Sequence, residues 1–363
     1  MQYSERLIHH PNSIESAAYT PTDSRQMKSI AFFNNKGGVG KTTLLCNLAG
    51  LFALHRKAKI LVIDADPQSN ATSYLMADDT LTELYSDDKF VNLYEYYEPV
   101  AKGKGYSTVP PSIITSPRFG VDLVPGHPRF ALREDLLAKD WSDTLVGNDR
   151  GLQTTFTFSH LLNTVASDYD FAFIDMGPSL GAINRSILLA ADYFLTPMSA
   201  DLFSLMAIEN IILSLQTWRN ELEAGLDYYE RKNGIRYAQD DKELKWKIVF
   251  LGYVMQQYKA KSVRGEVRPV ASYDKIIRQF PADIANLESE FGLGDPNTVD
   301  LGQFPSLYSL VPMSQTAHAP IFELGSSDGV VGAHFAKVDE SGVMFEQIAD
   351  RVISRLALSE AKV

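Results

Sequence analysis

The sequence of 363 residues contains a single cysteine, Cys46, and this scarcity excludes several kinds of protein. One thiol cannot form a disulfide framework within the chain, and it fits a reducing cytosol. It is also a poor basis for an iron–sulfur cluster, which usually takes about four thiolates. No apolar run reaches the roughly 18 residues that span a bilayer. The stretch MQYSERLIHHPNSIESAAY carries charges and no apolar core, so we do not expect a secretory signal.

The chain also lacks an excess of positive charge. Its 34 Lys and Arg residues are outnumbered by 45 Asp and Glu residues, which gives a net charge of −11 and a pI of about 5.2. A surface that coats DNA generally is therefore not expected, but a local basic patch is still allowed because phosphate contacts depend on local charge. With 45% apolar and 22% charged residues, the composition is that of a globular protein able to bury a core.

Apolar, β-branched or aromatic runs alternate with longer helix-like stretches along the chain. Several of these runs are apolar throughout, as in strands buried on both faces of a parallel sheet. The pattern predicts an α/β fold, in which helices flank a mostly parallel, twisted sheet through right-handed crossovers. The expected strands are Ser29–Asn34, Lys59–Asp64, Val121–Pro125, Phe171–Asp175, Tyr193–Pro197 and Lys247–Val254.

A few segments stand apart from this alternation. Residues 1–27 are polar, and we interpret them as an N-terminal arm before a single domain at 28–358. Within that domain we expect a variable excursion near 78–118 and a loop at 287–306. The charged stretch 219–247 predicts an exposed helix and turn.

The stretch FFNNKGGVGKTTLLCN (Phe32–Asn47) predicts a strand, a glycine-rich turn and an apolar helix. This is the context of a phosphate-binding loop, because glycines let successive backbone N–H groups point at phosphate oxygens and the helix N-terminus adds partial positive charge. Lys41 would reach the β- and γ-phosphates of a nucleotide, and Thr42 would place its hydroxyl on Mg²⁺. The predicted phosphate-binding residues are Gly37, Gly38, Val39, Gly40, Lys41, Thr42 and Thr43.

Two further predicted strands end in carboxylates. ILVIDADPQSNAT places Asp64 and Asp66 at the end of one strand, and FAFIDMGPSLG places Asp175 at the end of another. Ligands bind at the carboxyl ends of the strands in α/β sheets. A carboxylate there can hold a water bound to Mg²⁺ or orient an attacking water. The residues alone leave open which carboxylate takes which role.

The segment KGGVGKTT departs from the general G-x-x-x-x-G-K-[ST] pattern, because Asn35 stands where the first glycine is expected. It resembles the deviant Walker A motif of the ParA/MinD family of P-loop ATPases. In that family a signature lysine crosses a dimer interface to the nucleotide of the other subunit, and Lys36 matches its position. The resemblance covers most of residues 28–358.

This resemblance implies an enzyme that hydrolyses ATP with Mg²⁺, slowly and under stimulation by a partner, and that forms an ATP-dependent homodimer. Lys36, Lys41 and Asp66 would be its catalytic residues, with Asp66 polarising the hydrolytic water. The metal would be held by Thr42 and Asp175, while Asp64 supports its water shell. Asp64 and Asp66 lie in the segment DADPQ, and Asp175 lies in DMGPS. In DMGPS a glycine stands where the family more often has proline.

The resemblance also places two segments near the adenine. Gln256 or its neighbour Gln257 follows the strand GYVM, and Pro312 lies in SLVPMSQTAHAPIFEL, which is similar to a strand and following loop of the family.

The match is closest to ParA-type partition ATPases, whose ATP dimer binds DNA non-specifically and responds to a ParB-like adaptor. The stretch QYKAKSVRGEVRPVASYDKIIRQF supports this function, because only Glu266 and Asp274 oppose its basic residues. Such a stripe could neutralise several phosphates, although charges that merely solvate a helix pair are the alternative. The protein would then be cytoplasmic and nucleoid-associated. The DNA-binding candidates are Lys259, Lys261, Arg264, Arg268, Lys275 and Arg278.

Two other functions are alternatives. A MinD-like positioning ATPase would need a terminal amphipathic anchor for the membrane. The tail MFEQIADRVISRLALSEAKV mixes acids with Arg351 and Arg355, so we expect it to pack on the domain as a helix and do not expect membrane binding. The chain could instead be the regulatory ATPase subunit of a secretion, cargo-positioning or defence assembly.

Overall fold

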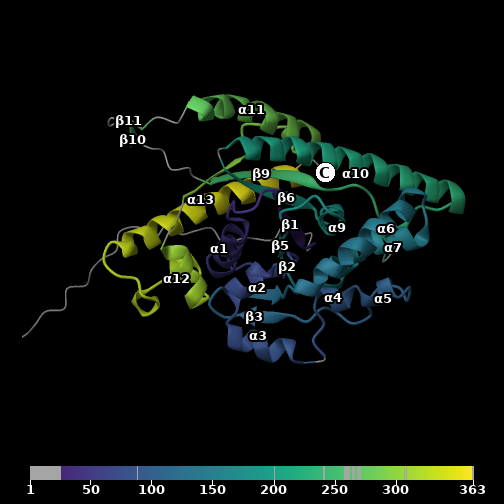
Figure 1. The fold of residues 1–363 in the computed structure, drawn as a ribbon, viewed down its shortest axis with the longest axis horizontal. Coiled ribbons are helices and arrows are strands. Elements are labelled where there is room, and N and C mark those ends of the chain that lie inside the picture. The colour runs from purple at the N-terminus through teal and green to yellow at the C-terminus, as the bar shows by residue number, and fades with distance from the viewer. Residues whose placement is uncertain are drawn as a thin grey trace, which may run out of the picture.

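The computed structural model describes residues 26–361, apart from 88, 200, 240–241, 257–261, 264–265, 268–270, 306 and 308. Eight strands of these residues form one sheet with helices on both faces (Figure 1). In sheet order they are β12 (Asp300–Phe304), β9 (Val249–Gln256), β6 (Tyr193–Ser199), β1 (Lys28–Phe32), β5 (Phe171–Asp175), β2 (Ile60–Asp64), β4 (Val121–Val124) and β3 (Ile114–Ser116).

Helices of very different length connect these strands. Those in the first half of the chain are α1 (Lys41–Leu54), α2 (Asn70–Leu75), α3 (Asp78–Tyr85), α4 (Leu93–Tyr96), α5 (Glu98–Ala101), η1 (Pro128–Arg133), α6 (Glu134–Leu145), α7 (Asp149–Thr155) and α8 (Thr157–Val165). Those in the second half are α9 (Ala182–Ala190), α10 (Leu202–Asn233), α11 (Ala271–Phe291), α12 (Leu310–Ala317), η2 (Ile321–Glu323), η3 (Ser326–Asp328) and α13 (His334–Glu360). Two small hairpins pair β7 (Ala238–Gln239) with β8 (Lys242–Glu243) and β10 (Ser262–Val263) with β11 (Glu266–Val267).

All neighbouring strands of the large sheet run parallel except β3 and β4. The chain leaves β1 through α1 to reach β2 on one side, and it later crosses from β5 through α9 to β6 on the other side. Strand β1 therefore lies where the strand order reverses, which is where α/β sheets bind ligands. In the register of the sheet Asp175 pairs with both Phe32 and Asp64, so the three strands end at the same level.

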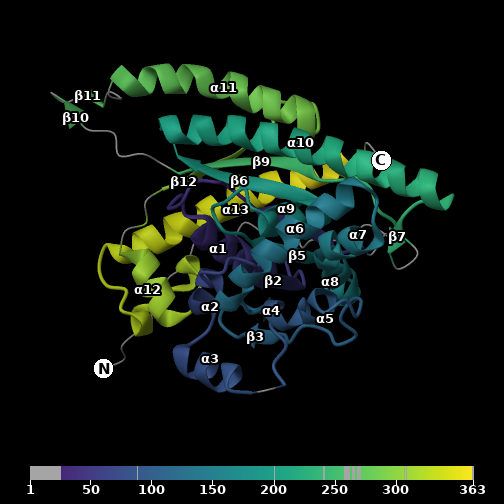
Figure 2. The ribbon, with the colours of Figure 1, turned by 45° about the vertical axis from the view of Figure 1, so that its right-hand side comes forward.

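The sheet buries both of its faces. Alternate side chains of β1 enter different core clusters, Ile30 and Phe32 on one face and Ala31 on the other. The first cluster is completed by α1 and α13, and the second by α8, α9, α10 and α11. Figures 1 and 2 both show α10 and α11 running side by side over that second face. Burial on both faces explains why the strands are apolar throughout.

The six predicted strands are confirmed, each within two residues of its observed ends. The predicted exposed helix and turn at 219–247 are also confirmed: α10 ends at Asn233, Gly234 follows with φ 74°, and the β7–β8 hairpin comes next. The C-terminal tail packs on the sheet as expected, because α13 buries an apolar face. That face includes Phe345, Ile348, Val352 and Leu356.

Three expectations were wrong or incomplete. The predicted loop at 287–306 contains the end of α11 and the edge strand β12, whose sequence DLGQF has no apolar run to reveal it. The segment around Pro312 is a helix, α12, and not a strand; its proline lies in the first turn, where a missing N–H costs no helical hydrogen bond. The excursion at 78–118 holds the short elements α3, α4, α5 and β3. The predicted N-terminal arm lies almost entirely outside the described residues.

Candidate active site

The turn between β1 and α1 has the geometry of a phosphate-binding loop. Gly38 and Gly40 have φ angles of 75° and 70°, in the left-handed region that glycine adopts without strain. Gly40 is the N-cap of α1, and no side chain caps that end of the helix. The first helical hydrogen bond runs from the Leu44 N–H to the Gly40 carbonyl, so the N–H groups before Leu44 are available to an anion.

A cleft of about 440 Å³ opens over this turn. Its walls come from the turn and start of α1 (residues 37–43), from the loops after β2 and β5, and from α2 and α12. The predicted residues Gly37 to Thr43 and Asp66 all line it. The remaining lining residues were not predicted from the sequence. Most of them follow Asp66 in DPQSNATSY, and their position just after a strand end could have indicated them. They are Gln68, Asn70, Ser73, Tyr74, Pro178 and Gln315.

Asp64 and Asp175 lie beside each other at the strand ends and are fully buried. Thr42 Oγ1 donates a 2.7 Å hydrogen bond to Asp175 Oδ2. Asp64 Oδ2 accepts bonds of 2.7 Å from both the N–H and the hydroxyl of Thr72. The second oxygen of each carboxylate, Oδ1, is buried and has no partner among the described residues. Each of these two buried oxygens could accept a hydrogen bond or contact a cation.

The pKa values of these buried groups are shifted by burial and by the charges of their neighbours. Burial raises the pKa of Asp64, and the neighbouring Asp175 raises it further. Burial also raises the pKa of Asp175, against the hydrogen bond from Thr42 and the charge of Lys41. Burial lowers the pKa of Lys41, while Asp175 and Asp66 oppose that change. A cation near the two carboxylates would relieve their repulsion.

Asp66 lies in a different environment from Asp64. Its Oδ1 accepts a 2.9 Å hydrogen bond from the Gln68 N–H, and its side chain lines the cleft. The turn after β5 approaches it closely, since a Cβ on Gly177 would lie 3.4 Å from Asp66 Oδ1. Asp66 is thus the carboxylate that reaches the cleft, while Asp64 is held behind it by Thr72.

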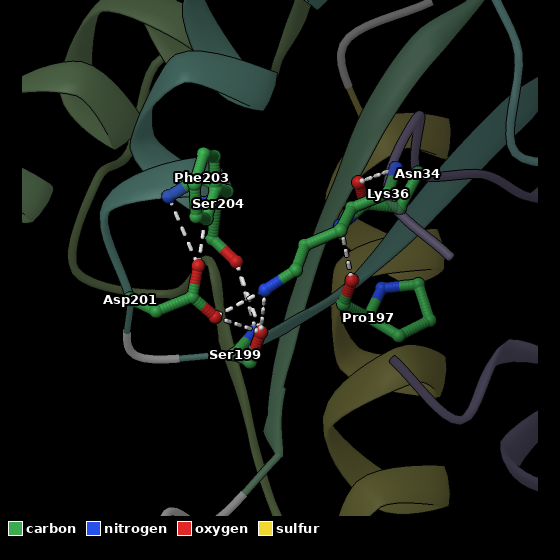
Figure 3. A network of polar contacts seen from close by, with 7 residues as sticks. All are labelled: Asn34, Lys36, Pro197, Ser199, Asp201, Phe203 and Ser204. Atoms are coloured by element: carbon green, nitrogen blue, oxygen red, sulfur yellow. Dashed lines mark hydrogen bonds and ion pairs between the residues drawn. The ribbon is translucent and has the colours of Figure 1, made fainter. Parts of the chain in front are cut away.

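Lys36 does not line the cleft, although Lys41 does. Figure 3 shows its amine directed at the loop between β6 and α10, where it pairs with Asp201 and donates a 3.0 Å bond to Ser199 Oγ. Asp201 is the N-cap of α10, because its Oδ1 accepts from the N–H groups of Phe203 and Ser204. Burial would raise the pKa of Asp201, but the bonds from Lys36 and Ser199 hold it below its usual value.

The two adenine candidates are not among the residues that line the cleft in the described structure. The Gln256 amide nitrogen lies 3.5 Å from the position of a Cβ on Gly40, so this residue is close to the phosphate-binding turn. Pro312 is exposed on α12, three residues before Gln315, which does line the cleft. A role for either in holding the base stays a prediction.

The structure does not test the DNA-binding candidates. Lys259, Lys261, Arg264 and Arg268 lie outside the described residues. Lys275 and Arg278 lie on α11, but their side chains are not described. Across the part of the chain that is described, no group of three or more His, Cys, Asp or Glu side chains is placed to hold a metal ion. None of its helices is both long and apolar enough to cross a membrane.

Solved structures support the fold. Protein DIP2308 from Corynebacterium diphtheriae has a TM-score of 0.65 and 28% identity, over 80% of this chain and 97% of that one. A Cyanothece McdA–ATP complex has a TM-score of 0.56 and 18% identity, over 92% of this chain and 97% of that one. The second likeness concerns the fold alone.

Sequence comparisons identify the family. A family model described as an AAA domain matches residues 27–228, more than half of the chain. The chromosome-partitioning ATPase Soj of Treponema pallidum is 32% identical over 60% of this chain and 74% of its own length. The virulence plasmid ParA family protein pGP5-D of Chlamydia psittaci is 26% identical over 54% of this chain. The chain spans 66% of that protein and 52% of Protein IncC from Escherichia coli. The chain belongs to the ParA family of P-loop ATPases.

Proposed function

We propose that this protein is a Mg²⁺-dependent ATPase that dimerises when it binds ATP, and that the dimer positions DNA or another cargo. The observation that carries the proposal is the pair of lysines at one glycine-rich turn. Lys41 lines the cleft over the turn, whereas Lys36 points out of it and is held by a separate loop. Lys41 would contact the nucleotide of its own chain, and Lys36 would contact that of a second chain once it leaves Asp201.

Nucleotide binding follows from the turn itself. The free N–H groups at the start of α1 and the Lys41 amine would hold the phosphates. The residues present also fit Mg²⁺: the Thr42 hydroxyl is bonded to Asp175, and Asp64 and Asp175, which are paired in neighbouring strands, each have an unpartnered oxygen. So few protein ligands suit an ion that keeps several waters and shares phosphate oxygens. When bound, the ion would neutralise charge on the β- and γ-phosphates.

In this proposal Asp66 orients the attacking water. Its carboxylate lines the cleft beside the β5–α9 turn, and its hydrogen bond from the Gln68 N–H fixes one oxygen. The other oxygen would accept a hydrogen bond from the water, which attacks the γ-phosphorus in line with the bond to ADP. Loss of the γ-phosphate then removes the contacts that hold the two chains together.

The surface around Lys36 supports the proposal that a second chain binds there. The start of α10 exposes two large apolar side chains, Phe203 at 68% and Met206 at 50%, one helical turn apart and next to the Lys36–Asp201 pair. In a face-to-face dimer, Lys36 would leave Asp201 and reach the partner's γ-phosphate. An additional cation of this kind can raise the rate of phosphoryl transfer by roughly 10³–10⁵.

The cargo is proposed from the relatives and the basic stretch. Soj of Treponema pallidum is named as chromosome-partitioning, and the Chlamydia relative is named for a virulence plasmid. The stretch 257–280 supplies six basic residues that a dimer would double, which favours non-specific DNA binding. We include stimulation by a ParB-like adaptor in the proposal by analogy with the ParA family.

One set of measurements tests the proposal. ATP hydrolysis with and without Mg²⁺ is followed by the release of phosphate, and the molar mass is measured by light scattering with ATP and with ADP. Retention on DNA is then measured with each nucleotide at two salt concentrations. We expect ATP-dependent dimers that bind DNA less tightly at the higher salt. Failure to hydrolyse ATP refutes the enzyme, and ATP dimers that never retain DNA refute the partition role.

A further inference from the structure

The turn that joins Asp175 to α9 is held by one buried side chain that belongs neither to the residues proposed for Mg²⁺ nor to the lining of the cleft. Asn184, in the first turn of α9, is 2% exposed. Its Nδ2 donates 2.7 Å hydrogen bonds to the carbonyls of Gly177 and Ser179, and it lies 3.3 Å from Ser179 Oγ. Both N–H bonds of the amide are therefore used on a single turn of three residues.

This turn touches the proposed chemistry at two points. Gly177 lies close to Asp66, because a Cβ added to it would come within 3.4 Å of Asp66 Oδ1. Pro178 lines the cleft itself. A shift of the turn would therefore change both the packing around the water-orienting carboxylate and the shape of the cleft.

The helix that carries Asn184 is itself fixed. Its N-cap, Gly181, offers no side chain, and Glu134 from the start of α6 takes over that role. The two carboxylate oxygens of Glu134 accept the N–H groups of Ala182 and Ile183, the latter at 3.0 Å. These bonds attach the start of α9 to α6 and so fix the position of Asn184.

We propose that Asn184 is a positioning residue for ATP hydrolysis: it holds the turn 177–179 in the one conformation that keeps Asp66 aligned with the attacking water. This inference rests on the proposed function of the same site. Glycine at 177 gives the turn a backbone of unusual freedom, and the two hydrogen bonds from Asn184 remove that freedom. A misplacement of about 1 Å at a catalytic group can cost roughly 10²-fold in rate.

The test compares Asn184→Asp with a control on the same helix. Aspartate keeps the size of the side chain but has no N–H groups, and its oxygens would repel the two carbonyls. Ser186→Ala is the control. Ser186 is also buried on α9, and its substitution removes a hydrogen bond to the Ile183 carbonyl but no bond to the turn. For each protein, kcat, KM, the affinity for a fluorescent ATP analogue and the thermal midpoint are measured. Hydrogen exchange is measured for the peptide 176–182.

We expect Asn184→Asp to lower kcat by about ten- to a hundredfold while KM and analogue affinity change less than about threefold. Exchange in 176–182 should become faster in this variant and not in Ser186→Ala. Ser186→Ala should keep kcat within about twofold of the wild type, although its thermal midpoint should fall about as far as that of Asn184→Asp. If Asn184→Asp does not fold, Asn184→Ala, which removes the donors without adding charge, provides the same comparison.

Three results would overturn the inference. They are a kcat of Asn184→Asp close to that of the wild type, an equal loss of kcat in Ser186→Ala, or a loss of kcat in Asn184→Asp without faster hydrogen exchange in 176–182. The proposed function fails separately. If the wild type hydrolyses no ATP, the ATPase is refuted, and the exchange comparison alone still decides whether Asn184 holds the turn.

Discussion

The ion pair between Lys36 and Asp201 should restrain ATP-driven dimerisation, and its removal should make the dimer tighter. The two side chains are 27% and 23% exposed, so the pair is neither fully solvated nor buried. In the proposed dimer Lys36 contacts the partner's phosphates, and the pair in each chain is broken. Substituting Asp201 removes this competing interaction before the dimer forms.

Asp201→Asn is the informative substitution because it separates two roles of the side chain. Asp201 Oδ1 caps α10 through Phe203 and Ser204, and asparagine is an equally good N-cap. The substitution removes the charge that holds Lys36, together with the oxygen Oδ2, which also accepts a 2.6 Å hydrogen bond from the Ser199 hydroxyl. A partly exposed pair contributes about 0.5–1 kcal/mol. Two pairs are broken per dimer, so the free energy of dimerisation changes by about 1–2 kcal/mol, or about five- to thirtyfold in the dimer dissociation constant.

The assay is sedimentation equilibrium or light scattering over a concentration series with a slowly hydrolysed ATP analogue. The thermal midpoint without nucleotide should stay close to that of the wild type. A matched control is Glu290→Gln, which breaks a pair of similar exposure with Arg219 on the α10–α11 surface and should leave dimerisation unchanged. An Asp201→Asn protein that dimerises no better than the wild type, or worse, contradicts the competition between Asp201 and the partner's phosphates.

Three further predictions follow from individual contacts. Asp66→Ala should keep the affinity for ATP and accumulate dimer, because binding does not need the water-orienting group; normal phosphate release by this variant would show that another residue has the role. Lys36→Ala should bind the first ATP within about threefold of the wild type but form little dimer, as judged by analogue titration and light scattering; dimers of normal affinity would rule out a contact across the interface. Arg355→Met should lower the free energy of unfolding by about 3–5 kcal/mol in denaturant titrations, because Glu288 and Arg355 are each 1% exposed and Glu288 would lose its buried counter-charge. Adding Glu288→Gln should recover part of that loss, and a single variant as stable as the wild type would contradict this account.

Much of the fold and the centre of the site could be predicted from the sequence, because both depend on neighbours along the chain. Strands buried on both faces are apolar throughout, and a phosphate-binding turn needs its glycines, lysine and threonine in consecutive positions. The carboxylates Asp64, Asp66 and Asp175 could be assigned to the site because parallel strands end at one edge of the sheet. The sequence could not show that Asp64 is held behind the cleft while Asp66 lines it, since that difference comes from the bonds of Asp64 to Thr72.

Tertiary structure alone decided the features that join distant segments. The strand β12 has no apolar run and exists because it pairs with β9 at the edge of the sheet. Lys36 and Asp201 are 165 positions apart in the chain, and no local pattern connects them. Asn184 is an ordinary polar residue of a helix until the fold brings the turn after β5 against it. The sequence by itself determined which chemical groups the site contains, because those groups lie in contiguous motifs. The packing of the sheet determined which of them line the cleft and which are restrained by other side chains, because those contacts are made between segments far apart in the chain.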